Sequence, residues 1–310
     1  MSEEVEKELK KIPGLSWLIK QAKKIILPGL EGLSLYDLWE IYSVGIIKGT
    51  FSTRAGSIAF SFFMALFPFL LFIFNLIPYV EETNLIDDFR IKFLLFIDTL
   101  LPPETQEYVS DIFADIANNP RGGLLSFSFL LSIFLMTNGV NAIFTGFEFS
   151  YHTNIKRSLF RQYIIAIGVS LVLAFLLLIT VILMVYLTYA VEDLSEYGLI
   201  ANDGSGANVV KYFAFVLLIY IAVATLYYFG TKEARKARFF SVGAFFTTIL
   251  IMLTSFLFGL YIENFSNYNE LYGSIGALLI LMVYIWLNAN ILLLGFELNA
   301  SLIKLKKNFK

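Results

Sequence analysis

The chain has 310 residues, of which 58% are hydrophobic and 15% are charged, and its mean hydropathy is +0.73. Because charged residues make up about a quarter of an ordinary soluble domain, this composition excludes such a domain and indicates a membrane protein with several spanning helices. The chain has no cysteine and a single histidine, His152, which excludes disulfides and thiolate metal sites and argues strongly against a histidine-based metal site.

The N-terminal region, residues 1–54, mixes charged and apolar residues and precedes the first long apolar run. Between residues 17 and 27, Trp, Leu and Ile interleave with lysines, which is typical of an amphipathic helix on an anionic membrane surface. Pro28 and Gly29 break this helix, and residues 35–50 predict a second one with aromatic interfacial anchors. The alternative is that the region only packs against the bundle. It lacks the apolar core and cleavage site of a signal peptide, so we expect the first spanning helix to act as the insertion signal.

Six apolar runs follow, and each is long enough to cross a bilayer, which takes about 20 residues. The predicted fold class is therefore an all-α membrane protein, a bundle of six transmembrane helices. The predicted spans are 55–80, 122–147, 163–191, 212–230, 239–262 and 271–296. They lie in a membrane domain of residues 55–303, which a basic tail, 304–310, follows.

Basic residues are distributed unequally between the two sides of this bundle. Most of the 23 lysines and arginines fall on the side that holds both termini. The exceptions on the other side are Arg90, Lys92, Arg121 and Lys211. The positive-inside rule then places both termini in the cytoplasm, and an even number of spans agrees with this.

The first external loop, residues 81–121, is acidic and too long for a simple connection. Apolar residues at helical spacing predict a short helix over 85–101, and a second over 104–117 follows Pro102 and Pro103. These helices either form a lid over an external entrance or a cap that stabilises the bundle.

Four asparagines interrupt the second and sixth spans. Asn138 and Asn141 are three residues apart and share a helix face, and Asn288 and Asn290 lie within the sixth span. Polar groups in hydrocarbon are costly, so they normally face other helices or a wet cavity. One interpretation is a polar, cytoplasm-facing cavity between helices one, two and six in which the asparagines contact a substrate. The alternative is a set of interhelical hydrogen bonds that hold the bundle, at about 0.6–2 kcal/mol each.

Ionisable and amide groups also gather where these spans meet the cytoplasm. They are Arg54, Glu148, Arg161, Glu297 and Asn299. A carboxylate so close to lipid needs a partner, so we expect Arg54 to pair with Glu297. Such a pair is either a structural clamp or a proton-coupled switch.

Pro68 lies near the middle of the first span. Proline removes one backbone hydrogen bond and usually kinks a helix. The kink is either a hinge for alternating access or a static feature of the helix.

Enzymatic motifs are absent from the sequence. There is no Walker A loop, no His-Glu-x-x-His, no Cys/His cluster and no second histidine for a catalytic dyad. We therefore expect a protein that is not an enzyme, with no catalytic residue, no cofactor and no metal.

Two segments resemble the YihY/BrkB family of bacterial inner-membrane proteins. The first is Arg54-Ala55-Gly56-Ser57-Ile58-Ala59-Phe60 with Leu66-Phe67-Pro68; the second is Tyr272-Gly273-Ser274-Ile275-Gly276-Ala277 with Trp286 and Leu294-Gly295-Phe296-Glu297-Leu298-Asn299-Ala300. Phe296 stands where the family pattern leads us to expect a small residue. Gly139-Val140-Asn141 and the basic segment 156–161 fit more loosely.

This resemblance covers about residues 40–305 and implies six transmembrane helices in a bacterial cytoplasmic membrane. The family carries an old label, ribonuclease BN, which we regard as misapplied because a metal-dependent ribonuclease needs ligand clusters that this chain lacks. What the resemblance implies instead is transport or export of a lipid-like or amphipathic compound.

The leading functional expectation is a transporter-like protein of the cytoplasmic membrane, without ATP hydrolysis, whose polar cavity lies between helices one, two and six. The alternative is a non-transporting membrane scaffold or an envelope-integrity factor. The expected partners are membrane lipids and a lipid-like or amphipathic substrate, with no nucleic acid, and a homo-oligomer is left open. The sequence specifies neither the substrate nor the direction nor a coupling ion.

Overall fold

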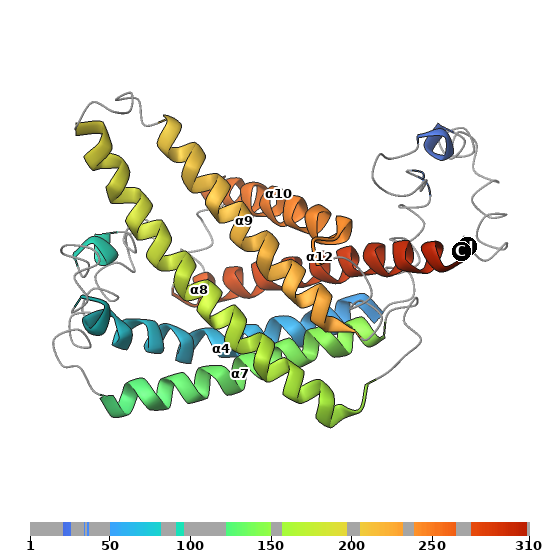
Figure 1. The fold of residues 1–310 in the computed structure, drawn as a ribbon, viewed down its shortest axis with the longest axis horizontal. Helices are drawn as coiled ribbons and strands as arrows, with labels where there is room; N and C mark the ends of the chain where they lie inside the picture. Colours follow the sequence, from blue (N-terminus) through green and yellow to red (C-terminus); the bar gives the residue numbers. More distant parts are fainter. Residues whose placement is uncertain are drawn as a thin grey trace. The chain divides into compact units, whose positions relative to one another are not determined.

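The computed structural model describes residues 21–25, 34, 36, 50–81, 91–95, 122–149, 157–196, 205–231, 239–264 and 274–308. Six long helices account for most of this part of the chain, which contains no β-strand (Figure 1). They are α4 (Thr50–Glu81), α7 (Gly122–Glu148), α8 (Leu159–Glu196), α9 (Ser205–Gly230), α10 (Val242–Asn264) and α12 (Ser274–Asn308). Residues 91–95 are also helical.

Each of the six helices is long and apolar enough to cross a membrane. The apolar spans are Phe51–Leu76, Leu125–Glu148, Leu159–Leu187, Val209–Gly230, Val242–Ile262 and Leu278–Ala300. The prediction of an all-α membrane protein is therefore confirmed. Each helix extends beyond its predicted span at one end or both, whereas α10 and α12 begin three residues later than predicted. A helix can continue beyond the bilayer because its backbone hydrogen bonds are internal. α12, for example, continues through the predicted basic tail as far as Asn308.

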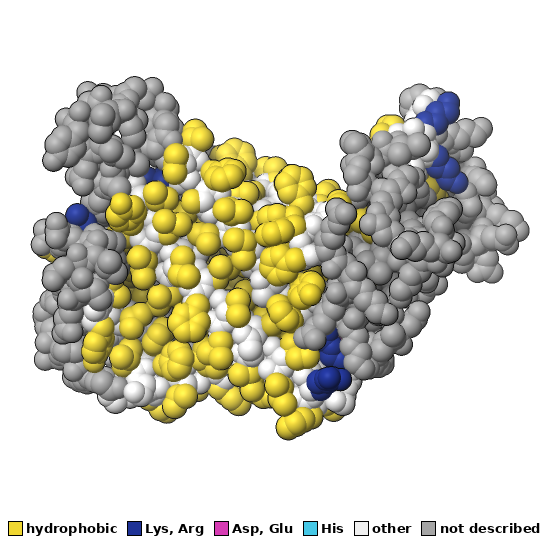
Figure 2. Space-filling model, viewed as in Figure 1, with side chains coloured by type: hydrophobic (Ala, Val, Ile, Leu, Met, Phe, Trp, Pro, Cys, Tyr) yellow, Lys and Arg dark blue, Asp and Glu magenta, His cyan; other side chains and the backbone are white. Residues whose placement is uncertain are grey.

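The surface of these helices is apolar, as a protein in contact with lipid requires. Hydrophobic side chains cover most of the described surface on the face seen in Figure 2. Leu130, Phe175 and Phe256 are 67%, 60% and 65% exposed. In water such contiguous apolar patches would lead to aggregation, but in a bilayer they contact acyl chains.

The chain divides into two compact units. Unit 1 consists of Met1–Phe60, Val140–Ile165 and Val223–Lys310, and unit 2 consists of Ser61–Gly139 and Ala166–Ala222. α10 and α12 belong wholly to unit 1, whereas α4, α7, α8 and α9 each contribute a part to both units.

Within unit 1, α10 packs closely against α12. Two glycines make this approach possible. A β-carbon at Gly295 would collide with Thr247 and lie 2.5 Å from the hydroxyl of Tyr227, and one at Gly243 would lie 2.8 Å from the carbonyl oxygen of Gly295. Small residues let helix backbones come close, which is a common source of stability between membrane helices.

Aromatic rings fill the centre of unit 1. Phe147 of α7 stacks on Phe296 of α12 with their ring centroids 3.9 Å apart and their planes at 9°. Tyr227 of α9 meets both rings edge-on, at 5.6 Å and 5.7 Å. A β-carbon at Gly230 would lie 2.5 Å from the ring of Phe147. The large side chain at position 296, where a small one was expected, therefore has a packing role in this chain.

Unit 2 has a separate apolar core. Its buried members come from α4, the segment 91–95, α7 and α8: Ala65, Phe69, Ile73, Phe93, Met136, Ala174 and Val185. On α7, a β-carbon at Gly139 would lie 3.0 Å from the ring of Phe62, so the glycine leaves room for that ring. Pro68 is buried, and α4 continues through it from Thr50 to Glu81. Whether Pro68 acts as a hinge stays a prediction.

Several predictions concern parts of the chain that lie mainly outside the described residues. Of the predicted N-terminal amphipathic helices, residues 21–24 are described and helical. Of the predicted helices in the external loop, only 91–95 is described. The domain boundaries at 54 and 303 likewise stay predictions.

Candidate functional site

Arg54 connects three helices of unit 1. Its Nη1 donates a hydrogen bond to the backbone oxygen of Gly146 in α7, at 2.8 Å. Its guanidinium carbon lies 4.6 Å from the ring centroid of Phe51. Glu297 of α12, which is only 5% exposed, interacts electrostatically with Arg54. The arginine therefore interacts with a carbonyl, a ring and a carboxylate inside an apolar region. Whether the Arg54–Glu297 pair acts as a clamp or as a switch stays a prediction.

Two hydrogen bonds between charged side chains and backbone atoms connect the end of α7 to α9. The Oε1 of Glu148 accepts a hydrogen bond from the backbone nitrogen of Arg157 at 3.0 Å. The Nη1 of Arg157 donates to the backbone oxygen of Phe229 at 2.6 Å. Arg157 is buried, whereas Arg161, which the sequence singled out, is exposed. Both arginines precede the third span, and the sequence does not tell which one turns inward.

An amide network links α7 to α8. The Nε2 of Gln162 donates to the Oδ1 of Asn141 at 3.0 Å and lies 3.1 Å from the Oγ1 of Thr145, a second acceptor. Gln162 is 2% exposed, and its Oε1 is buried without a hydrogen-bond partner among the described residues. Sequence reasoning missed Gln162, although a glutamine at the start of an apolar span is itself a signal.

The two asparagines of α12 bond first to their own helix. The Nδ2 of Asn288 donates to the backbone oxygen of Tyr284 at 2.9 Å, and the Nδ2 of Asn290 donates to that of Trp286 at 2.7 Å. The Oδ1 of Asn288 is buried and has no hydrogen-bond partner in the described part of the chain. Residues two apart point to different sides of a helix, so Asn288 and Asn290 do not share a face.

The remaining predicted residues differ in their surroundings. Asn299 is 5% exposed and packs against Gly243 of α10. Asn138 is half-buried and belongs to unit 2, whereas Asn141, Asn288 and Asn290 belong to unit 1. A single cavity lined by all four asparagines therefore stays a prediction.

Tyr227 and Thr247 form a polar contact that sequence reasoning missed. The Tyr227 hydroxyl has a single proton, which it can donate to the hydroxyl oxygen of Thr247, 2.7 Å away, or to the backbone oxygen of Leu292, also at 2.7 Å. Thr247 donates to the backbone oxygen of Gly243 at 2.8 Å. Two adjacent tyrosines end the fourth apolar run, and the sequence alone does not show which of them faces α12.

No group of three or more His, Cys, Asp or Glu residues suited to a metal ion occurs within the residues that the structure describes. In the described part of unit 1, the polar chemistry is that of hydrogen-bonding amides and hydroxyls together with the charged side chains of Arg54, Glu148, Arg157 and Glu297. Such groups can bind and orient the polar part of a solute.

A sequence model of the family described as Virulence factor BrkB matches residues 45–308, which include all six long helices. This chain belongs to the BrkB family. The resemblance noted in the sequence is thereby confirmed. A relative of this chain from Bacillus subtilis (strain 168) is named "Putative ribonuclease-like protein YfkH" and is 30% identical over 263 residues, or 82% of this chain and 91% of YfkH.

Two further relatives in this family are named only as membrane proteins. A "UPF0761 membrane protein" of Actinobacillus pleuropneumoniae is 24% identical over 270 residues, or 85% of this chain and 90% of the relative. Another, from Alteromonas mediterranea, is 25% identical over 280 residues, or 89% and 91%. No solved structure matches the chain significantly. The BrkB family and the six apolar helices together make this an integral membrane protein.

Proposed function

We propose that this BrkB-family protein is a transporter-like protein of the bacterial cytoplasmic membrane. In this proposal a lipid-like or amphipathic solute moves past the polar side chains that α4, α7 and α12 contribute to unit 1. Asn141, Asn288 and Asn290 contact the polar part of the solute, and Asn138 of unit 2 is a further candidate contact. The distribution of lysine and arginine supports a cytoplasmic location of both termini.

One observation carries the proposal. The Oδ1 of Asn288 is a buried acceptor that no described residue satisfies, and it lies in the apolar span Leu278–Ala300. A buried acceptor left unpaired is destabilising by about 1–3 kcal/mol, so such groups in native proteins normally bond to water or a ligand. A hydrated path or a solute group beside Asn288 would supply the missing donor.

The ionisable residues of unit 1 support the same interpretation. Arg54 and Glu297 both lie within apolar spans and interact electrostatically. Ionisable residues inside membrane helices are rare and commonly mark a pathway for ions, protons or substrates. In the proposal this pair acts as the switch that alters access to the path.

The alternative, a non-transporting scaffold or envelope-integrity factor, is favoured by a different observation. Asn288, Asn290 and Thr145 each donate to the backbone oxygen four residues earlier in their own helix. Side chains used in this way need no solute. A scaffold would have the same tight α10–α12 contact and the same packing of the Phe147, Tyr227 and Phe296 rings.

The relative YfkH is named as a putative ribonuclease-like protein, and the proposal does not include such an activity. Purified protein is expected to leave a labelled RNA intact with Mg²⁺, Mn²⁺ or Zn²⁺ present. Cleavage that disappears with a chelator would contradict this expectation.

A lipid-movement assay tests the proposed transport. The full chain is reconstituted into vesicles that contain a phospholipid with a fluorescent headgroup, and a membrane-impermeant reductant reports the fraction reaching the outer leaflet over time. A set of fluorescent amphipathic solutes is tested in the same way. The protein is expected to accelerate movement of at least one probe, and Asn288→Leu and Glu297→Gln to slow it several-fold.

Phe256→Leu provides the matched control, because Phe256 is 65% exposed on a lipid-facing surface. This variant is expected to retain the rate of the unmodified protein. Rates equal to those of protein-free vesicles for every probe would contradict transport and leave the scaffold as the better account.

A further inference from the structure

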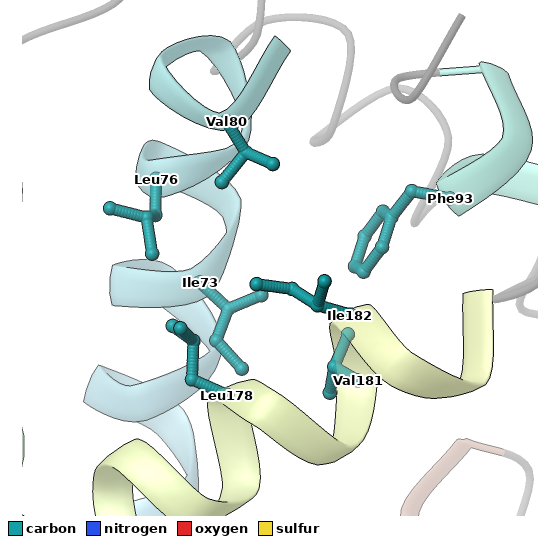
Figure 3. Close-up of a pocket in the computed structure, with 7 residues that line it drawn as sticks. All are labelled: Ile73, Leu76, Val80, Phe93, Leu178, Val181 and Ile182. Carbon is teal, nitrogen blue, oxygen red and sulfur yellow. The ribbon is translucent and has the colours of Figure 1, made fainter. Parts of the chain in front are cut away.

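An apolar groove lies within unit 2. Its walls come from α4, α8 and the helical segment 91–95 (Figure 3). The lining side chains are Ile73, Leu76, Val80, Phe93, Leu178, Val181 and Ile182. About 270 Å³ within it is not filled by protein atoms, and part of this space is open to the surroundings.

Well-packed side chains hold the walls of this groove in place. Phe93 is 1% exposed, and its ring meets that of Phe74 edge-on at 6.3 Å. Ile73 is 8% exposed and belongs to the buried core of unit 2. In Figure 3 the ring of Phe93 points toward Ile182. Packing of this kind favours a preformed groove rather than a transient gap between side chains.

The groove lies at the end of two apolar spans, and part of its wall lies beyond them, because Val80 follows the span Phe51–Leu76 and Phe93 belongs to the loop predicted to be external. Ile73 and Leu76 belong to the apolar span Phe51–Leu76, and the three α8 residues belong to Leu159–Leu187. Large hydrophobic side chains flank it on the same helices and are exposed: Leu70, Leu71, Leu177 and Ile179. The groove is thus continuous with a surface that contacts lipid in a membrane-spanning protein.

We propose that this groove binds one acyl chain of a membrane phospholipid. A water molecule needs two to four polar partners, and the hydrocarbon side chains that line the groove offer none. An empty apolar space would forfeit dispersion contacts along its walls. Acyl chains are the apolar molecules that surround these helices in a bilayer, and the lining matches them chemically.

The size of the groove sets how much of the lipid it holds. The volume of about 270 Å³ includes space open to the surroundings, so the volume that the walls themselves enclose is far below the range of about 300–1,000 Å³ that encloses most of a drug-sized ligand. The groove therefore receives a stretch of one chain, while the rest of the lipid stays in the bilayer. This site rests on the membrane location of α4 and α8 and is independent of the transport proposed for unit 1.

Photocrosslinking of the full chain in vesicles tests the proposal. The probe is phosphatidylglycerol with a diazirine on one acyl chain, and the labelled residues are located by peptide mass spectrometry. Groove residues are expected to be labelled several-fold more often than the lipid-facing positions Phe213 and Leu217 of α9, which are 70% and 43% exposed. Equal labelling of the groove and of these positions would overturn the proposal.

Groove-filling variants make the test specific. Val181→Phe is expected to reduce labelling of the remaining groove residues several-fold. Val172→Phe, at a position on the same helix that is 48% exposed, is the matched control and is expected to leave that labelling unchanged. Val80→Phe fills the groove from α4 and replaces Val181→Phe if the latter does not give a folded protein. Undiminished groove labelling in a folded groove-filling variant would also overturn the proposal.

Discussion

At the scale of single residues, Arg54 and Glu297 are ionisable groups that lie within apolar spans, where a charge needs a partner. Arg54 is held by the Gly146 carbonyl and interacts electrostatically with Glu297, which is 5% exposed. In a double-mutant cycle, the effects of Arg54→Gln and Glu297→Gln on the free energy of unfolding are expected to differ from additivity by about 0.5–3 kcal/mol, because the two side chains stabilise each other. Unfolding in mixed micelles measures this, and additive effects would contradict the pairing.

Tyr227 offers a residue-scale test of the polar contact between α9, α10 and α12. Its hydroxyl meets Thr247 and the Leu292 carbonyl, each at 2.7 Å. Tyr227→Phe keeps the ring packing and removes this hydroxyl, so we expect a loss of about 1 kcal/mol in the free energy of unfolding. Tyr212→Phe, at a side chain that is 67% exposed, is the control and is expected to change stability little. Equal effects of the two variants would show that the buried hydrogen bonds contribute nothing.

At the scale of helices, Gly295 sets how closely α12 approaches α10. Gly295→Ala would force a β-carbon against Thr247 and Tyr227. Overpacking of this kind is destabilising by about 1–3 kcal/mol. Gly259→Ala on α10 is the matched control, because a β-carbon there meets nothing within 4 Å and alanine favours a helix by up to about 1 kcal/mol. Thermal unfolding of both variants checks this, and a Gly295→Ala protein as stable as the control variant would rule out the tight contact.

Hydropathy predicted the helices well. A segment that crosses lipid must satisfy its own backbone hydrogen bonds as a helix, and its side chains are mostly apolar, so it appears in the sequence as one long apolar run. It could not predict which polar residue of a run turns inward. Gln162 and Arg157 are buried, while the sequence had pointed to Arg161, which is exposed. Likewise, Asn288 and Asn290 appeared equivalent in the sequence, but of these two residues Asn288 alone has a buried Oδ1 that no described residue satisfies. Which residues face inward depends on how each helix is rotated about its own axis relative to its neighbours. This rotation is determined by packing between helices and cannot be inferred from composition.

At the scale of the whole molecule, the six spans among the described residues predict that both termini lie on one side of the membrane. Because the chain has no cysteine, single cysteines report sidedness directly. With a membrane-impermeant thiol reagent, Ser2→Cys and Asn308→Cys are expected to be labelled in inside-out vesicles only. Asn202→Cys, between the third and fourth predicted spans, is expected to be labelled in right-side-out vesicles only. Termini labelled from opposite sides would contradict an even number of spans.

The central claim is that polar side chains of unit 1 reach water from one side of the membrane. The measurement that tests it most directly is thiol labelling of Asn141→Cys and Asn288→Cys in vesicles of both orientations, with Phe175→Cys as a lipid-facing control that is 60% exposed. We predict labelling of both asparagine positions from the cytoplasmic side and none of the control. If neither asparagine position is labelled from either side in folded protein, these groups are packed against one another, and the transporter-like function is contradicted.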